Sequence, residues 1–189
     1  MKSDNKKNNE AIDELVKKSQ QGDKQAFSHL YDLLINSIYR YVYFKATGPD
    51  VEDLVEVIFI KIWQNLDKYE KTEYQFTTWA FKIAHNTVID HYRKHRPLYP
   101  LDETIIIADD NKETNPKLQT ENSLNNSIVK KALNELKDPY KQILVLKFIE
   151  DLSNEEIAEI TGRSEVSIRV TKYRGLKKLR EILIKHGIS

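Results

Sequence analysis

A sharp break at Thr161-Gly162-Arg163 most constrains the fold, because it separates two helix-like runs between Leu152 and Leu183. Glycine supplies the left-handed backbone that a tight turn needs, and Ser164 is a typical N-cap for the second run. Before the break, the stretch Ser153–Glu156 fits a capping box. Two helices joined by a short glycine turn are typical of a helix-turn-helix. We expect four apolar side chains to fill the wedge between the helices, namely Ile157, Ile160, Val166 and Ile168.

Positive charge is concentrated in the second run. Residues 161–189 carry eight lysines and arginines against two glutamates, a net charge of +6, whereas the whole chain has a net charge of +1. This asymmetry favours a polyanionic partner over the alternative, a helical hairpin in a bundle with its charges in water. The first turns of such a helix enter the major groove of DNA, and later turns contact phosphates. The expected DNA contacts are Ser164, Glu165, Ser167, Arg169, Lys172, Tyr173, Arg174, Lys177 and Lys178.

The rest of the chain is predicted to be helical as well. Apolar residues recur at steps of three and four from residue 24 to 46, from 51 to 66 and from 76 to 95, and no strand pattern is present. Asp50 and Asp138 are the expected N-caps of two of these helices, and Phe59 and Trp63 are expected in the core. The predicted fold is all-α, with two small helical domains.

A stretch of different character separates the two domains. Residues 98–122 are polar, acidic and interrupted by Pro116, which indicates a flexible linker. Fully extended, it would reach roughly 85 Å. We therefore divide the chain into a disordered tail over 1–9, a first domain over 10–97, the linker over 98–122 and a second domain over 123–186.

Several function classes are disfavoured. The chain has no cysteine, so neither a disulfide framework nor a thiolate metal site is available. Its N-terminus lacks a secretory signal and its apolar runs are too short to span a membrane, so we expect a cytoplasmic protein without membrane insertion. His91 and His95 lie one helical turn apart, but Arg93, Lys94 and Arg96 would repel a metal cation. We expect no cofactor, no metal and no enzymatic activity.

In combination, these features resemble the sigma factors of bacterial RNA polymerase, of the extracytoplasmic-function (ECF) type. The resemblance covers the chain from about Glu14 to Leu183. In the second domain it is carried by Ala132–Leu136, Tyr140, Leu144, Leu146 and Leu152–Ala158. In the first domain it is carried by Gly22–Asp23, Ala26–Phe27, Asp50–Val55, Phe59, Trp63, Phe76–Trp79, Ile83–Asn86, Asp90 and Arg93–Lys94.

The resemblance implies a role for each part of the chain. The first domain, called region 2 in this family, would read and open the minus-ten promoter element. The second domain, called region 4, would read the minus-thirty-five element and touch the flap of RNA polymerase, while the linker threads its channels. The expected contacts of region 2 with duplex and melted promoter DNA, where aromatic rings suit unstacked bases, are Tyr69, Tyr74, Phe76, Trp79, Lys82, Asn86, Asp90, Arg93 and Lys94.

The resemblance also implies protein partners. An acidic cluster on the helix that begins near Asp50 would grip the clamp helices in the largest subunit of the polymerase core, through Asp50, Glu52, Asp53 and Glu56. An anti-sigma factor is a further expected partner. The sequence departs from the family pattern at Glu56-Val57, where Gln-Glu is usual, at Thr171, where a base is common, and at Arg163, where an apolar residue is common.

Two other classes of function fit parts of the sequence. A stand-alone regulator would bind DNA through the helix-turn-helix and use its first domain to dimerise. A helical adaptor would bind proteins only. The first is distinguished by promoter binding that needs no polymerase core, and the second by the absence of salt-dependent DNA binding.

Overall fold

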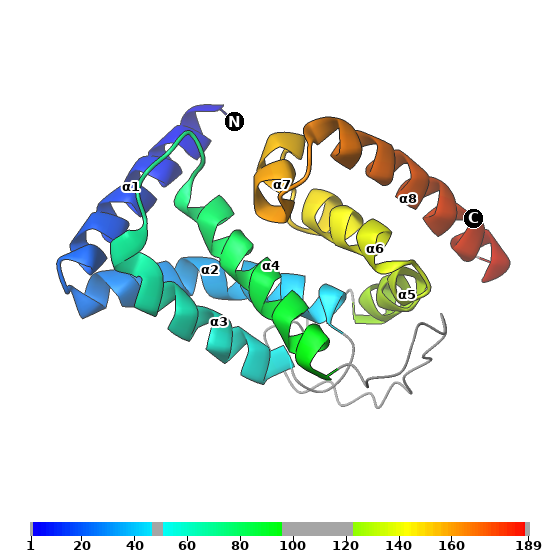
Figure 1. The fold of residues 1–189 in the computed structure, drawn as a ribbon, viewed down its shortest axis with the longest axis horizontal. Helices are drawn as coiled ribbons and strands as arrows, with labels where there is room; N and C mark the ends of the chain where they lie inside the picture. The colour runs from blue at the N-terminus through cyan, green and yellow to red at the C-terminus, as the bar shows by residue number, and fades with distance from the viewer. Residues whose placement is uncertain (1, 47–50, 96–122, 188–189) are drawn as a thin grey trace.

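The computed structural model describes residues 2–46, 51–95 and 123–187, and within these ranges every regular element is helical (Figure 1). The prediction of an all-α fold is therefore confirmed. The first domain contains α1 (Lys2–Gln20), α2 (Lys24–Lys45), α3 (Val51–Asn65), the short 3-10 helix η1 (Leu66–Lys68) and α4 (Phe76–His95). The second contains α5 (Ser123–Asn134), α6 (Asp138–Leu144), the π-helical turn η3 (Val145–Ile149), α7 (Asn154–Thr161) and α8 (Glu165–Lys185).

The first domain is built around the apolar stripe of α2. Asp23 caps this helix by accepting hydrogen bonds from the backbone N–H groups of Gln25 and Ala26. The stripe then buries Leu30, Leu34, Ile38 and Tyr41 against α3 and α4. Phe59 is in the core as predicted, but Trp63 is exposed, which contradicts the prediction. One residue further along α3 than the buried Ile62, Trp63 is rotated by about 100° away from the core.

Local signals in the second domain are largely confirmed. Ser153 and Glu156 form the reciprocal capping box of α7, Gly162 ends this helix with φ of 66°, and Ser164 caps α8. Ile157, Ile160 and Ile168 fill the wedge, whereas Val166 is exposed. The prediction for Val166 is wrong because this residue lies two positions before Ile168, on nearly the opposite side of α8.

Two predicted helix starts differ from the structure. Lys137, not Asp138, is the N-cap of α6, and Asp138 is its first helical residue. The Asp138 carboxylate is then free to pair with Lys45 of α2. At the N-terminus, α1 begins at Lys2 where a disordered tail was predicted, because no glycine or proline interrupts the chain before Gln20. Asp50 and the predicted linker lie outside the described residues, so these predictions and the domain boundaries remain untested.

The two domains are packed against each other, which the prediction of separate domains on a tether did not include. Helix α4 lies against α7 and α2 against η3, so that the buried apolar residues of both domains form one connected core (Figure 1). Helix α8 runs along the outer edge of the second domain, away from the first. Among the described helices, none combines the length and apolar character that a bilayer span requires.

Gly162→Ala should lower the free energy of unfolding by about 1–2 kcal/mol, the cost of a left-handed conformation at a residue with a Cβ. An added Cβ would meet no atom within 4 Å, so the loss comes from the backbone alone. Gly162→Asn is the matched control, because asparagine tolerates this conformation better. Urea denaturation measures both, and equal stability of Gly162→Ala and the wild type would contradict this account of the turn.

Candidate nucleic-acid and polymerase interface

The aromatic residues expected to meet promoter DNA form a cluster at the start of α4. The ring centroids of Tyr69, Phe76 and Trp79 lie 5.1 to 5.3 Å from one another. Phe76 is fully buried and Tyr69 nearly so, whereas Trp79 and Tyr74 are partly exposed. The expectation that Phe76 and Tyr69 stack on bases is therefore not met in this arrangement, because their rings pack into the core and support Trp79 instead.

The polar residues expected on α4 fall into two groups. Asn86, Arg93 and Lys94 are exposed, and Arg93 Nη2 lies 3.0 Å from a carboxylate oxygen of the half-exposed Asp90. Lys82, nearer the start of α4, is instead paired with the second domain. The C-terminal half of α4 thus remains open to a nucleic acid, while its N-terminal half faces α7.

Two hydrogen bonds join α4 to α7. Thr78 Oγ1 donates to Glu156 Oε1 over 3.0 Å, and Lys82 Nζ lies 2.7 Å from Glu159 Oε1. Glu156 also closes the capping box of α7, so one carboxylate serves both the turn and the domain contact. An acidic side chain of α7 is therefore paired with a half-exposed basic residue that was expected to contact DNA.

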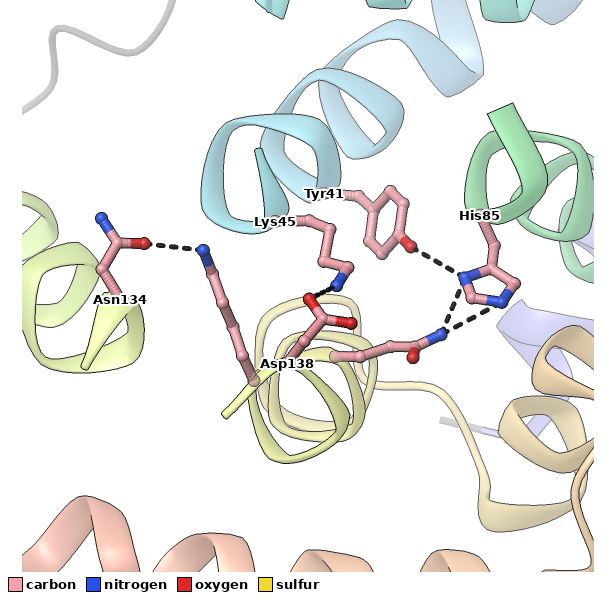
Figure 2. A network of polar contacts seen from close by, with 7 residues as sticks. Tyr41, Lys45, His85, Asn134 and Asp138 are labelled. Atoms are coloured by element: carbon pink, nitrogen blue, oxygen red, sulfur yellow. Dashed lines mark hydrogen bonds and ion pairs between the residues drawn. The ribbon is translucent and has the colours of Figure 1, made fainter. Parts of the chain in front are cut away.

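A second set of contacts is centred on His85 of α4 (Figure 2). Gln142 Nε2 of α6 donates to His85 Nδ1 over 2.7 Å, and Tyr41 Oη lies 3.5 Å from the same nitrogen. The same amide nitrogen lies 3.2 Å from His85 Nε2. Because an amide N–H can only donate, a ring nitrogen of His85 must accept, which requires a neutral imidazole. Burial, with Lys45 nearby, lowers the pKa of His85 to about 4.

Two buried lysines, Lys45 and Lys141, and the exposed Asp138 lie around His85. Lys45 of α2 pairs with Asp138 of α6, and burial lowers the pKa of Lys45 while Asp138 opposes that shift. Lys141 Nζ donates to Asn134 Oδ1 over 2.6 Å, and burial beside Lys45 lowers its pKa to about 7. Lys45 lies on α2 and Asp138 on α6, so this pair depends on the relative position of the domains, whereas Lys141 and Asn134 both belong to the second domain.

Arg40 and Glu150 form a further contact across the domains. Arg40 Nε and Nη2 donate to the two carboxylate oxygens of Glu150 over 2.9 and 2.8 Å, a bidentate geometry that combines strength with directionality. The Glu150 side chain is buried, and burial raises its pKa although Arg40 acts in the opposite direction. We refer to the contacts of Arg40, Thr78, Lys82, His85 and the Lys45–Asp138 pair as the domain lock.

The basic helix α8 presents its outer face to solvent. Tyr173, Arg174, Lys177 and Lys178 are exposed, as expected for DNA contacts, and Arg169 pairs with Glu165 one turn earlier. Lys178 Nζ lies 2.8 Å from Glu181, a pair that solvent screens.

Three other expected DNA contacts, in α8 and at its N-cap, are half-buried or bonded within the protein. Ser167 is half-buried, and the Ser164 hydroxyl is used as the helix cap. Lys172 is half-buried and its Nζ lies 3.4 Å from Asn154 Oδ1 at the start of α7. Lys172 is thus turned towards the start of α7.

An apolar groove between α2 and α3 was missed by the sequence analysis. It holds a cavity of about 660 Å³, with Phe27, Tyr31, Ile60 and Trp63 in its lining and Glu52 and Glu56 among the polar members. The signal was available, since apolar residues at 57–60 occupy more than one face of α3. Glu52, Asp53 and Glu56 are exposed beside it, as expected for a docking surface. Within the described residues, no group of three or more potential metal-ligating side chains occurs.

Comparison with known proteins finds two family models in order along the chain. The model described as Sigma-70 region 2 matches residues 26–97, and the model described as Sigma-70, region 4 matches residues 127–179. The ECF RNA polymerase sigma factor SigW of Bacillus subtilis is 31% identical over 184 residues, covering 91% of this chain and 96% of SigW. BldN of Streptomyces coelicolor, also an ECF sigma factor, is 28% identical over 171 residues, covering 90% of this chain and 65% of BldN.

Solved structures share the fold. CnrH, in complex with the cytosolic domain of CnrY, superposes with a TM-score of 0.70 at 22% identity, covering 93% of this chain and 98% of CnrH. The sigma factor RpoE of Bartonella quintana, in complex with the anti-sigma factor NepR, superposes with a TM-score of 0.63 at 22% identity, covering 83% and 96% of the two chains.

The free energy of unfolding should fall as the pH drops from about 6.5 towards 4. The unfolded chain binds a proton at His85 near pH 6.5, but the folded chain resists it until about pH 4. The expected contribution is roughly 1 kcal/mol per pH unit, measured by urea denaturation as the difference in slope between wild type and His85→Gln. His29→Gln, at an exposed histidine, is the control. Parallel profiles for wild type and His85→Gln would refute a buried neutral His85.

Proposed function

The chain belongs to the sigma-70 family of bacterial RNA polymerase sigma factors, in its ECF group, and we propose that it binds the polymerase core and directs it to specific promoters. The observation that carries this proposal is the presence, in one chain, of a capped helix-turn-helix with a basic outer face and a region 2 domain with an open groove. The polymerase performs the chemistry in the cytoplasm, and this chain contributes recognition.

Region 4 supplies duplex recognition. In the proposed complex, α8 enters the major groove of the minus-thirty-five element with its first turns, where Arg169 and Tyr173 reach base edges. Arg174, Lys177 and Lys178 lie further along the exposed face and contact phosphates. The support for this assignment is that these five side chains are all exposed, whereas Ile168 of the same helix is buried.

Region 2 supplies promoter opening. Trp79 and Tyr74, which are partly exposed next to the buried Tyr69 and Phe76, present rings to the unstacked bases of the minus-ten element. Asn86, Arg93 and Lys94 then line the path of the strand along α4. A buried aromatic cluster under an exposed ring keeps the ring in place, which lowers the entropic cost of stacking.

The groove between α2 and α3 is the proposed docking site for the clamp helices of the polymerase core. Its lining offers Trp63, Tyr31 and Ile60, while Glu52, Asp53 and Glu56 provide negative charge at the edge. Aromatic residues in a pocket with a polar rim are typical of an interface. RpoE was solved with the anti-sigma factor NepR, and CnrH with the cytosolic domain of CnrY. We propose that this chain also has an anti-sigma partner.

The packed arrangement must open for the proposed function. The two promoter elements are about 25 base pairs apart, which is roughly 85 Å at about 3.4 Å per base pair. In the structure, however, Lys82 of α4 touches Glu159 of α7, and only three residues separate α7 from α8. Both elements cannot be read at once from this position. The stretch between α4 and α5 is long enough to let the domains separate.

The proposal is tested by run-off transcription with core polymerase on a library of promoter fragments. The chain alone should bind promoter duplex weakly at physiological salt, and the core should confer sequence preference. Tight and specific promoter binding without core would instead favour the stand-alone regulator.

Asp53→Lys combined with Glu56→Lys should abolish binding to the polymerase core in a pull-down and leave the free energy of unfolding almost unchanged. Both side chains are exposed, so the reversals cost little stability but replace attraction with repulsion at the docking site. Glu10→Lys combined with Glu14→Lys on α1 makes the same change of charge elsewhere and should bind core normally. Unchanged core binding by the α3 variant would rule out this face as the docking surface.

A further inference from the structure

The N-terminal half of the outer face of α8 carries three exposed apolar side chains in line. Val166, Val170 and Tyr173 are 68%, 43% and 72% exposed. At about 100° per residue, Val170 lies about 40° to one side of Val166 and Tyr173 about 20° to the other. The buried Ile168 and Gly175 lie on the opposite side of the helix. We call Val166, Val170 and Tyr173 the apolar stripe.

The position of the stripe, rather than its apolar character alone, requires an explanation. Single exposed apolar residues are ordinary on protein surfaces. Two valines on a solvated helix face, however, reduce helix propensity without packing against anything that compensates. Both lie in the first two turns of α8, the part of a helix-turn-helix that reaches base edges.

The surroundings of the stripe are basic. Arg169 and Arg174 flank it about 60° and 80° to either side of Val166, and Lys177 and Arg180 continue the same face towards the C-terminus. From Val166 to Tyr173 the stripe is about 10.5 Å long at about 1.5 Å per residue, close to the width of about 12 Å of the major groove. A basic frame around an apolar centre complements a phosphate backbone on either side of a groove.

We propose that the apolar stripe reads the 5-methyl groups of thymines in the upstream promoter element, with Val166 and Val170 as specificity-determining residues. The thymine methyl is the apolar group that a base pair displays in the major groove, and apolar side chains recognise it by contact. This inference rests on the proposed function, since it requires α8 to enter duplex DNA. Tyr173 lies at the C-terminal end of the stripe, on the same face of α8.

The test replaces each thymine of the upstream element, one at a time, by deoxyuridine, which lacks only the methyl group. Holoenzyme is assembled from the full-length chain and core polymerase, and promoter binding is measured on an upstream element selected from a randomised library. At one or two positions the wild type should bind the deoxyuridine promoter about fourfold more weakly, the transfer free energy of one buried methyl group. At the remaining thymines the substitution should have no effect.

Val166→Ala and Val170→Ala should each remove the preference for thymine over deoxyuridine at one of these positions. Alanine raises helix propensity, so both variants keep the fold. Ile184→Ala is the matched control. Ile184 is 59% exposed on the same face, but it lies about 27 Å from Val166, beyond the width of the groove. This variant should retain the full preference for thymine.

The outcomes separate the inference from the proposed function. If wild-type holoenzyme requires the upstream element but never distinguishes thymine from deoxyuridine, the stripe does not read methyl groups and the inference fails alone. The same holds if both valine variants keep the wild-type preference. If wild-type holoenzyme is indifferent to the upstream sequence altogether, the assignment of region 4 as a reader of duplex DNA fails as well.

Discussion

The polar contact between the two domains is the interaction on which the rest of the structure depends. Gln142 and Tyr41 converge on a neutral His85. Lys45, Lys141 and the Glu150 side chain are buried around the same interface, and the exposed Asp138 pairs with Lys45. Burying such groups costs free energy unless every partner is in place, and the pairs recover little beyond that cost. An interface of this kind is specific, yet water can replace its partners once the domains move apart. The domain lock is therefore suited to a closed state that opens.

Separation of the two domains connects polymerase docking at the groove between α2 and α3 with DNA binding by α4. In the closed chain Thr78 is buried and the half-exposed Lys82 is paired with an acidic side chain of α7, while the groove between α2 and α3 and the outer face of α8 stay exposed. Core polymerase can therefore meet the groove first, and separation of the domains then uncovers α4. Any ligand that needs the open chain binds with an apparent affinity reduced by the fraction of open molecules. In the proposed function, promoter recognition therefore follows binding to the polymerase.

The features that could be predicted from the sequence are those set by residues close together in the chain. Helix positions, the capping box at Ser153 and the glycine turn follow from spacing and from residues within a few positions of one another. The domain lock was missed because it joins residues far apart, with 57 positions between His85 and Gln142 and 110 between Arg40 and Glu150. Each of these side chains is polar, and a polar residue taken alone predicts a position on the solvent-exposed surface. Periodicity also placed Trp63 and Val166 in the core, because an apolar residue next to a buried one does not reveal its side of the helix.

The most direct test is to hold the domains together. The chain has no cysteine, so Lys82→Cys with Glu159→Cys introduces a single pair at the lock, which a linker with a reducible disulfide can join. Glu14→Cys with Lys18→Cys, a pair within α1, controls for the linker. We expect the locked chain to lose promoter opening with core polymerase and to regain it when the linker is reduced, while the control is active throughout. Promoter opening by the locked chain at the level of the reduced chain would contradict the account.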